Sequence, residues 1–346
     1  MTTATGTFVV LNVNYPACSW PGVSEGAVPI ELAGPLGPVG NAHRVYEVRG
    51  LPASCAIKMG PGAECPEDEK DARQVAMQLG ARDSLWGEYE KLLAADGLCG
   101  RAPLAYAYGA FVEAGDGGRA RIAPAFVMER LDAEPLCHVV ERGALPVRRV
   151  IEAGLMLVDL VDDLARRRIA HGNLSPENVL IEAGDADRVE RACVVDFQLA
   201  VSRDEEGGRI GSLPFTAPEQ IGLSLVGCNP REWYLRRLSR EPYADMWSVG
   251  ALLYYTATGE RPALPVRWGK GSDGAYSFWY GGQRLDFEEA LACVNDSKID
   301  GLDLPGPWRD EEGGSALGSA IRLCTSNAAC EREIATVRGM LEEALK

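Results

Sequence analysis

Short apolar runs dominate the first part of the chain. Between Ile30 and Leu131 these runs are rich in β-branched residues and are broken by polar positions, a pattern that predicts strands. The clearest of them are residues 45–48, 54–58 and 123–131. Residues 69–94 differ, because their apolar positions recur at intervals that place them on roughly one face of a helix. The pattern therefore predicts a small sheet with one long helix.

The second part of the chain is predominantly helical. Residues 147–167 are apolar nearly all round, which is typical of a buried helix. Residues 1–28 contain one short apolar alternation and then a stretch punctuated by Pro and Gly, and we expect this extension to pack on, or pair with, the domain that follows. The expected organisation is an N-terminal extension over 1–28, a strand-rich lobe over 29–131 and a helical lobe over 132–346.

Composition restricts the class of protein. With 46% hydrophobic and 25% charged residues among its 346 positions, the chain can bury a substantial core. No uncharged apolar run reaches the length of about 18 residues that a membrane span needs, and the N-terminus lacks the pattern of a secretory signal. The formal charge of −15 opposes the binding of nucleic acid.

The cysteines and histidines restrict the class of protein further. The ten cysteines include no Cys-x-x-Cys pair and the three histidines are dispersed, so neither a zinc site nor a small disulfide scaffold is predicted. Several cysteines lie in apolar surroundings, which suits free thiols in a reducing compartment. We therefore expect an intracellular, cytoplasmic protein.

The motif that carries most chemistry is residues 171–178, His-Gly-Asn-Leu-Ser-Pro-Glu-Asn. It resembles the catalytic loop of protein kinases, His-Arg-Asp-x-Lys-Pro-x-Asn, but Asn173 replaces the catalytic Asp and Ser175 replaces the Lys. Three further landmarks of that family follow in order: Asp-Phe-Gln at 196–198 (in place of Asp-Phe-Gly), Ala-Pro-Glu at 217–219 and Asp-Met-Trp-Ser-Val-Gly at 245–250.

The catalytic-loop motif also resembles that of small-molecule phosphotransferases of the aminoglycoside-kinase kind. The motifs at 217–219 and 245–250 are foreign to those enzymes and favour the protein-kinase branch. The resemblance to eukaryotic-type protein kinases covers residues 30–340. It implies an α+β, bilobal protein-kinase-like fold, with a single kinase-like domain over 29–346 and a five-stranded small lobe.

The resemblance also implies ATP and Mg²⁺ as cofactors. Lys58 matches the strand Lys that holds the α- and β-phosphates, and Glu88 matches the helix Glu that pairs with it, with Glu90 as the competing candidate. Asn178 and Asp196 match the two metal ligands. The residues that match adenine or phosphate contacts are Gly40, Val45, Ala56, Met128, Glu129, Leu131 and Leu180.

The phosphate-binding glycine loop is depleted. Only Gly40, the middle glycine of Gly-x-Gly-x-x-Gly, is present, while Pro38 lacks a backbone N–H and His43 adds bulk. Glycines allow backbone N–H groups to approach phosphate closely, so the phosphate contacts here should be poorer. The alternative is an ordinary turn between strands.

The catalytic loop has lost two functional groups. Asn173 cannot accept a proton at neutral pH, and loss of a positioned base costs on the order of 10²–10⁴ in rate. Ser175 removes a cation from the transition state. These changes predict a pseudokinase that binds ATP and Mg²⁺ but transfers phosphate weakly or not at all, acting as a scaffold or allosteric regulator. The alternative is an active Ser/Thr kinase, or another kinase-fold transferase, with a divergent loop.

The resemblance also assigns structural roles. Glu219 should form an ion pair with Arg332, and Asp245 should hold the backbone of the catalytic loop. For protein partners, two regions stand out: the Arg- and aromatic-rich segment 221–242, and the helix-G region with its aromatic group. That group consists of Trp268, Tyr276, Phe278, Trp279 and Tyr280. The alternative is that these aromatic side chains fill the core of the large lobe.

Overall fold

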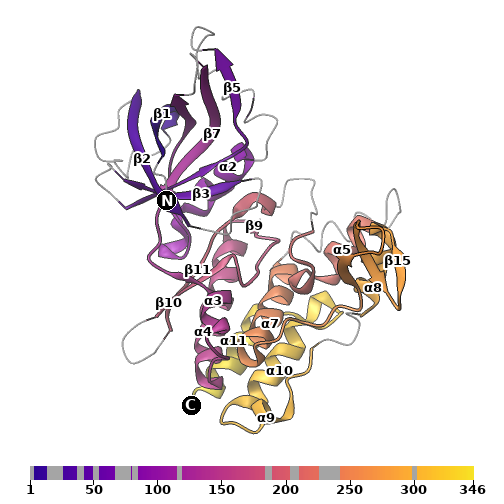
Figure 1. Ribbon diagram of the computed structural model, residues 1–346. Coiled ribbons are helices and arrows are strands. Elements are labelled where there is room, and N and C mark those ends of the chain that lie inside the picture. The colour runs from indigo at the N-terminus through magenta and orange to yellow at the C-terminus, as the bar shows by residue number, and fades with distance from the viewer. Residues whose placement is uncertain are drawn as a thin grey trace. The chain divides into compact units, whose positions relative to one another are not determined.

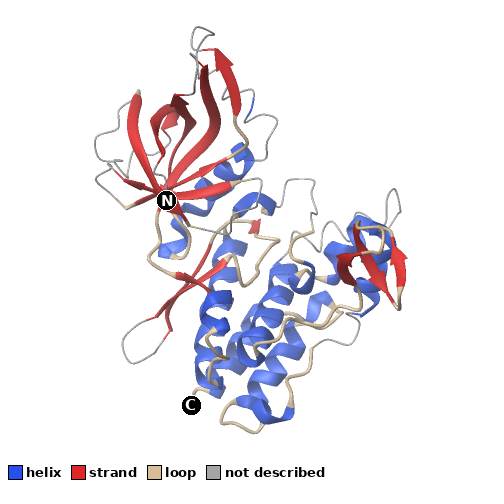
Figure 2. Ribbon diagram, viewed as in Figure 1, coloured by secondary structure: helices blue, strands red, loops and turns tan. Residues whose placement is uncertain are grey.

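The structure is a computed structural model. It describes residues 4–13, 26–36, 43–49, 54–66, 79, 85–114, 119–183, 189–202, 210–225, 242–297 and 302–346. The chain separates into two compact units, Met1–Asp132 and Ala133–Lys346, and each is described below by itself. Figure 1 labels the elements of both units, and Figure 2 shows that the strands gather in the first unit and the helices in the second.

An antiparallel sheet forms the body of the first unit. Its strands are β1 (Ala4–Val13), β2 (Ala27–Pro35), β3 (Arg44–Arg49), β4 (Cys55–Met59), β5 (Ala63–Pro66), β6 (Ala105–Ala114) and β7 (Arg119–Glu129). They are hydrogen-bonded in the order β4-β3-β2-β1-β6-β7-β5, and β4 also pairs with β7. That additional pairing closes the strands from β4 round to β7 into a barrel (Figure 1).

The prediction of five strands in this unit is wrong. The N-terminal segment forms β1, which lies between β2 and β6 as an integral strand. Two glycines permit the close approach: a Cβ at Gly109 would lie 2.1 Å from the carbonyl oxygen of Val9, and Gly6 is equally crowded. Phe8 and Val10 of β1 are buried in the barrel core. The extension therefore completes the sheet rather than merely packing on it.

One helix is described in the first unit, α2 (Leu85–Ala95), followed by the short helix η1 (Asp96–Gly100). Most of the predicted helix over 69–94 lies outside the described residues. Tyr89 of α2 is fully buried, with its ring 5.6 Å from that of Tyr108 and 5.8 Å from that of Phe126. Burial raises the pKa of Tyr89 to about 12. Aromatic packing therefore fixes this helix to β6 and β7.

Helices dominate the second unit. They are α3 (Leu136–Glu141), α4 (Val147–Arg166), α5 (Pro218–Leu225), α7 (Pro242–Thr258), α8 (Phe287–Ser297), α9 (Gly306–Arg309), α10 (Gly314–Cys324) and α11 (Ile334–Ala344), with short helices η3 (Phe197–Leu199), η4 (Leu213–Phe215) and η5 (Ala329–Glu331). Helix α4 confirms the helix predicted over 147–167. It packs against α7 and α11, and α10 packs against α7 and α11 (Figure 1).

Small sheets join these helices. Strands β8 (Glu134–Pro135), β10 (Val179–Ala183) and β11 (Val189–Val194) form one sheet, β9 (Ile169–Ala170) and β12 (Val201–Ser202) a second, and β13 (Arg267–Lys270), β14 (Tyr276–Tyr280) and β15 (Gln283–Leu285) a third. The third sheet lies against α8. Among the described residues, no helix is both long and apolar enough to cross a membrane.

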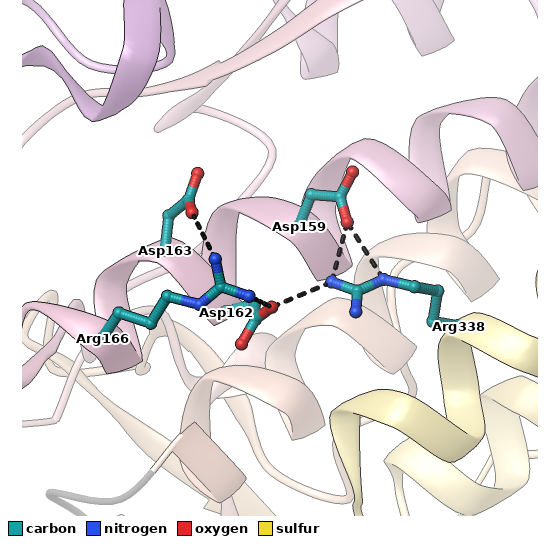
Figure 3. A network of polar contacts seen from close by, with 5 residues as sticks. All are labelled: Asp159, Asp162, Asp163, Arg166 and Arg338. Atoms are coloured by element: carbon teal, nitrogen blue, oxygen red, sulfur yellow. Dashed lines mark hydrogen bonds and ion pairs between the residues drawn. The ribbon is translucent and has the colours of Figure 1, made fainter.

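A polar network fastens the last helix to α4. Arg338 of α11 donates to Asp159 at 2.8 Å and to Asp162 at 3.1 Å (Figure 3). Arg166 donates to Asp162 from the same helix, at 2.7 Å, and also pairs with Asp163. Three carboxylates on one helix would repel one another, so the two guanidinium groups both neutralise α4 and hold α11 on it.

Candidate functional site

Lys58 and Glu88 form a buried ion pair in the first unit. Lys58 lies on β4, opposite Val45 of β3 and Phe126 of β7. Its Nζ donates to Glu88 Oε1 on α2 at 2.7 Å, and the two side chains are only 7% and 3% exposed. Glu90, the competing candidate, is exposed. Burial of both charges makes the pair mutually dependent, because either one alone would lose a counter-charge at 2.7 Å in a low-dielectric interior.

The residues matched to adenine contacts are divided between the two units. In the first, Ala56 on β4 lies opposite Met128 on β7, and both are buried. Glu129 is held at the end of β7: its backbone N–H donates to the carbonyl oxygen of Leu104 at 2.8 Å, and its carboxylate accepts the N–H of Leu104 at 3.2 Å. Val45 and Leu131 are partly buried. Strand pairing therefore fixes the backbone at this end of β7.

Leu180 and Gly40 differ from the other matched residues in where they lie. Leu180 belongs to the second unit, where it lies on β10 opposite Cys193 of β11 and is partly buried. Gly40, and with it most of the candidate phosphate loop between β2 and β3, lies outside the described residues. His43, at the end of that loop, is buried.

A buried aspartate holds the start of the catalytic-loop motif. Asp245 of α7 accepts the backbone N–H of His171 at 2.7 Å and that of Gly172 at 2.8 Å. Burial raises the pKa of Asp245 to about 6, and the two hydrogen bonds act in the opposite direction. The His171 ring meets Phe197 edge-on, with centroids 5.0 Å apart. The role predicted for Asp245 as an anchor of this loop is confirmed.

The two altered positions of the loop are both engaged within the chain. Asn173 Oδ1 accepts the backbone N–H of Ser212 at 3.1 Å. Ser175 is only 3% exposed, and its carbonyl oxygen accepts the N–H groups of Asn178 and Val179, both at 3.0 Å. Neither side chain can supply what it replaces, since an amide is not a base at neutral pH and a hydroxyl carries no positive charge.

Asn178 and Asp196 lie at the same end of the β10–β11 ribbon. Val179 pairs with Val194, and the N–H of Val195 donates to the carbonyl oxygen of Asn178 at 2.9 Å, so the residue after Val195 lies beside Asn178. Asp196 is partly buried and has a left-handed backbone, with φ of 67°.

The donor atoms at this end of the ribbon suit a hard cation. Asn178 Nδ2 donates to the carbonyl oxygen of Asn173 at 3.0 Å. That bond uses the nitrogen of the amide and not its oxygen, Oδ1, which is the atom that could bind a metal ion. A carboxylate and an amide oxygen fit Mg²⁺, which usually takes its remaining ligands from water and phosphate. Within the described ranges, no group of three or more His, Cys, Asp or Glu side chains is placed to hold a metal ion by itself.

The ion pair predicted between Glu219 and Arg332 is present. Arg332 Nη1 donates to Glu219 Oε1 at 2.6 Å and to the carbonyl oxygen of Tyr243 at 3.0 Å. The guanidinium group is fully buried, and its Nε donates to the carbonyl oxygen of Ser326 at 2.8 Å. These bonds fix the start of α5 to the C-terminal part of the chain.

An ion pair involving the catalytic-loop motif was missed by sequence reasoning. Glu177, inside the catalytic-loop motif, accepts a hydrogen bond from Arg261, 84 residues further along. The Arg261 guanidinium also lies over the rings of Phe215 and Tyr255, 5.8 and 5.9 Å from their centroids. Burial acts to raise the pKa of Glu177, but the hydrogen bond and charge of Arg261 outweigh it and the pKa lies below its ordinary value. No local pattern in the sequence signals this contact.

The aromatic group of the helix-G region is divided between core and surface. Phe278 packs with Leu285 against the apolar side chains of α5 and α8. Tyr276 and Tyr280 are 62% and 51% exposed, and Trp279 is partly buried with its Nε1 donating to the carbonyl oxygen of Gly269. Residues 226–241, which hold the arginines of the other candidate partner region, lie outside the described residues, as does the side chain of Trp268.

Comparison with known proteins identifies kinases as relatives. No family model matches the chain. It is 27% identical over 231 residues to serine/threonine-protein kinase PknL of Mycobacterium tuberculosis, covering 66% of this chain and 51% of that one. It is 35% identical over 99 residues to serine/threonine-protein kinase RAD53 of Saccharomyces cerevisiae, covering 27% and 11%. Calcium-dependent protein kinase 5 of Arabidopsis thaliana is 28% identical over 167 residues, covering 47% and 26%.

These similarities point to one class of protein. The relatives are Ser/Thr protein kinases at low identity, and they support the protein-kinase superfamily for this chain. The mixed α+β structure is consistent with a kinase-like fold. The chain spans about half the length of the PknL proteins that it matches.

Proposed function

We propose that this protein is a pseudokinase: a kinase-like domain over residues 29–346 that binds ATP and Mg²⁺, transfers phosphate weakly or not at all, and regulates a signalling partner. The observation that carries the proposal is a contrast within the chain. The buried Lys58–Glu88 pair is intact at 2.7 Å, whereas the position of the catalytic base is held by Asn173, whose side-chain oxygen already accepts a backbone N–H.

The nucleotide-binding half of the proposal rests on retained groups. Lys58, oriented by Glu88, would hold the α- and β-phosphates. Asn178 and Asp196 would hold Mg²⁺, which neutralises phosphate charge when bound. The adenine ring would pack among apolar side chains and hydrogen-bond to the backbone near the end of β7. The residues assigned to this nucleotide site are Val45, Ala56, Met128, Glu129, Leu131 and Leu180, with Gly40 in the phosphate loop.

The loss of transfer follows from the catalytic loop. An acceptor hydroxyl must lose its proton as the phosphoryl group moves, and Asn173 cannot take it. Ser175 supplies no cation for the charge on the transferring group, and it is buried rather than projected from the loop. Each loss alone is expected to slow transfer by on the order of 10²-fold or more.

A protein without this chemistry would act through binding. Of the four large hydrophobic side chains that are exposed in the described part of the chain, three lie between residues 276 and 287. These are Tyr276, Tyr280 and Phe287, on or next to the β13–β15 sheet. Exposed aromatic residues favour protein interfaces, so we assign this sheet, together with segment 221–242, to partner binding in the cytoplasm.

An active Ser/Thr kinase is the second candidate. Two observations favour it. The relatives PknL and RAD53 are named serine/threonine-protein kinases, and the groups matched to phosphate and metal binding are present in Lys58, Glu88 and Asp196. On this alternative, phosphoryl transfer would proceed without a side-chain base.

Two assays on the purified chain separate these candidates. Thermal denaturation with ATP, with and without Mg²⁺, measures binding, and transfer of radiolabelled phosphate to the chain itself and to a generic protein substrate measures catalysis. The proposal predicts a stabilising shift with ATP, lost in Lys58→Met, and no transfer above that of Asp196→Ala. Robust transfer that Asp196→Ala abolishes would establish the active kinase instead.

A further inference from the structure

A short segment of backbone is tied to the altered catalytic loop. The N–H of Ser212 donates to Asn173 Oδ1 at 3.1 Å. Gly211, just before it, is pressed onto the same side chain, because a Cβ at Gly211 would lie 2.3 Å from Asn173 Oδ1. Only a residue without a side chain fits there. Contact and hydrogen bond together place residues 211–212 directly on Asn173.

Gln220 forms a second tie between the same two segments. Its Nε2 donates to the carbonyl oxygen of Gly172 at 3.1 Å, and its Oε1 accepts the N–H of Ala217 at 3.1 Å. Gln220 is only 3% exposed, so water does not compete for these bonds. Gly172 itself has a φ of +72°, and a Cβ there would lie 3.5 Å from Gln220 Nε2 and 3.2 Å from the carbonyl oxygen of Leu199. Glycine therefore suits this position of the contact.

The segment between the two ties is also held by hydroxyl groups, one of its own and one from α7. Thr216 Oγ1 donates to the carbonyl oxygen of Ser212 at 2.9 Å, and Ser248 Oγ donates to that of Phe215 at 2.7 Å. All of these hydrogen bonds join neutral groups. No ionised or phosphorylated side chain takes part in them.

We propose that Asn173 is a positioning residue, whose side-chain oxygen holds the Gly211–Ser212 backbone on the catalytic loop and keeps residues 211–217 in one conformation without phosphorylation. The inference rests on the proposed function, since it gives a structural role to the residue that has lost its catalytic one. It means that a partner would meet an ordered segment at all times.

The role requires an acceptor at position 173 and not an amide as such. An aspartate would accept the N–H of Ser212 equally well, whereas alanine cannot. The structure therefore predicts that Asn173→Asp keeps the tie and Asn173→Ala breaks it. Restoring the carboxylate alone should leave phosphate transfer absent, because Ser175 still supplies no cation.

Hydrogen exchange of the peptide covering residues 210–217 tests this on the intact chain. Loss of one hydrogen bond should make the Ser212 amide exchange about two- to tenfold faster in Asn173→Ala. In Asn173→Asp the Ser212 amide should exchange as it does in the wild type, because a carboxylate oxygen also accepts this N–H.

Gly211→Ala provides an independent perturbation from the other side of the contact. Its added methyl group must displace the segment, so exchange over 210–217 should rise. Gly339→Ala, in α11 with open space around the added carbon, is the matched control and should change nothing there. Unchanged exchange of residues 210–217 in both Asn173→Ala and Gly211→Ala would overturn the positioning role. Strong phosphate transfer by the wild type would instead overturn the proposed function and leave the tie intact.

Discussion

Replacing Glu88 by Gln should destabilise the first unit by far more than its small change in shape suggests. The substitution keeps the size of the side chain and removes its charge. Lys58 Nζ, on a side chain only 7% exposed, would stay buried and lose the negative charge that now lies 2.7 Å from it. Breaking a buried pair from one side costs about 3–5 kcal/mol.

The matched control lies two residues away on the same helix. Glu90 is exposed, so Glu90→Gln removes the same charge from α2 without uncovering a buried partner. A surface change of this kind is expected to alter the free energy of unfolding by no more than about 0.5 kcal/mol. The difference between the two variants therefore isolates the buried pair from the general effect of one negative charge fewer.

Two measurements are needed. Urea denaturation gives the free energy of unfolding, and hydrogen exchange of β4 and α2 under native conditions reports on the first unit separately from the second. Glu88→Gln should lower the protection of both elements, and Glu90→Gln should leave it as it is. If Glu88→Gln were as stable as the wild type, Lys58 would have to be hydrated or otherwise compensated, and the reasoning from burial would be refuted.

Three further perturbations test other parts of the structure. Asp245 binds a proton more tightly when folded, with a pKa of about 6 against 3.8, so its contribution to stability should fall by about 2 kcal/mol as pH rises from 4 to 7. Unfolding measured over this pH range should show the fall in the wild type but not in Asp245→Asn. Gly109→Val should expel β1, since its Cβ would lie 2.1 Å from a backbone oxygen, and hydrogen exchange of β1 and β6 should become faster. The control Gly87→Ala adds its methyl group in open space and should leave both strands protected. Arg338→Ala should cost about 0.5–1 kcal/mol by loss of its contacts with α4; a thermal midpoint unchanged in low salt would show that the network of Figure 3 adds no stability.

The parts of the fold that depend on local pattern could be predicted from the sequence. The helix expected over 147–167 is α4 (Val147–Arg166), because apolar residues that recur nearly all round a long segment favour a buried helix. The Glu219–Arg332 pair was expected from the resemblance to protein kinases, and both side chains are buried together.

Closure of the barrel could not be predicted in the same way. The alternation in residues 7–13 indicates a strand but not its neighbours. Pairing of β1 with β6 depends on Gly6 and Gly109 allowing the two backbones to approach, and these residues are about a hundred positions apart in sequence. A lone glycine in a strand carries no information about what approaches it.

The contacts around the catalytic loop were hidden for a related reason. Asn173 reads as a lost base in the sequence, and its bond to Ser212 joins residues 39 positions apart. Glu177 likewise finds Arg261 only through the fold. Motifs identify the residues of such a site, whereas the partners that each side chain acquires depend on the tertiary structure.

The most direct test of the central claim is a single measurement of phosphate transfer by Asn173→Asp/Ser175→Lys beside the wild type, with ATP binding confirmed in the same samples. Both proteins should bind ATP, because Lys58, Glu88, Asn178 and Asp196 are unchanged. The account predicts no transfer by the wild type and measurable transfer by the double variant, in which the base and the cation are restored. Transfer by the wild type at a rate comparable to that of the double variant would contradict the account.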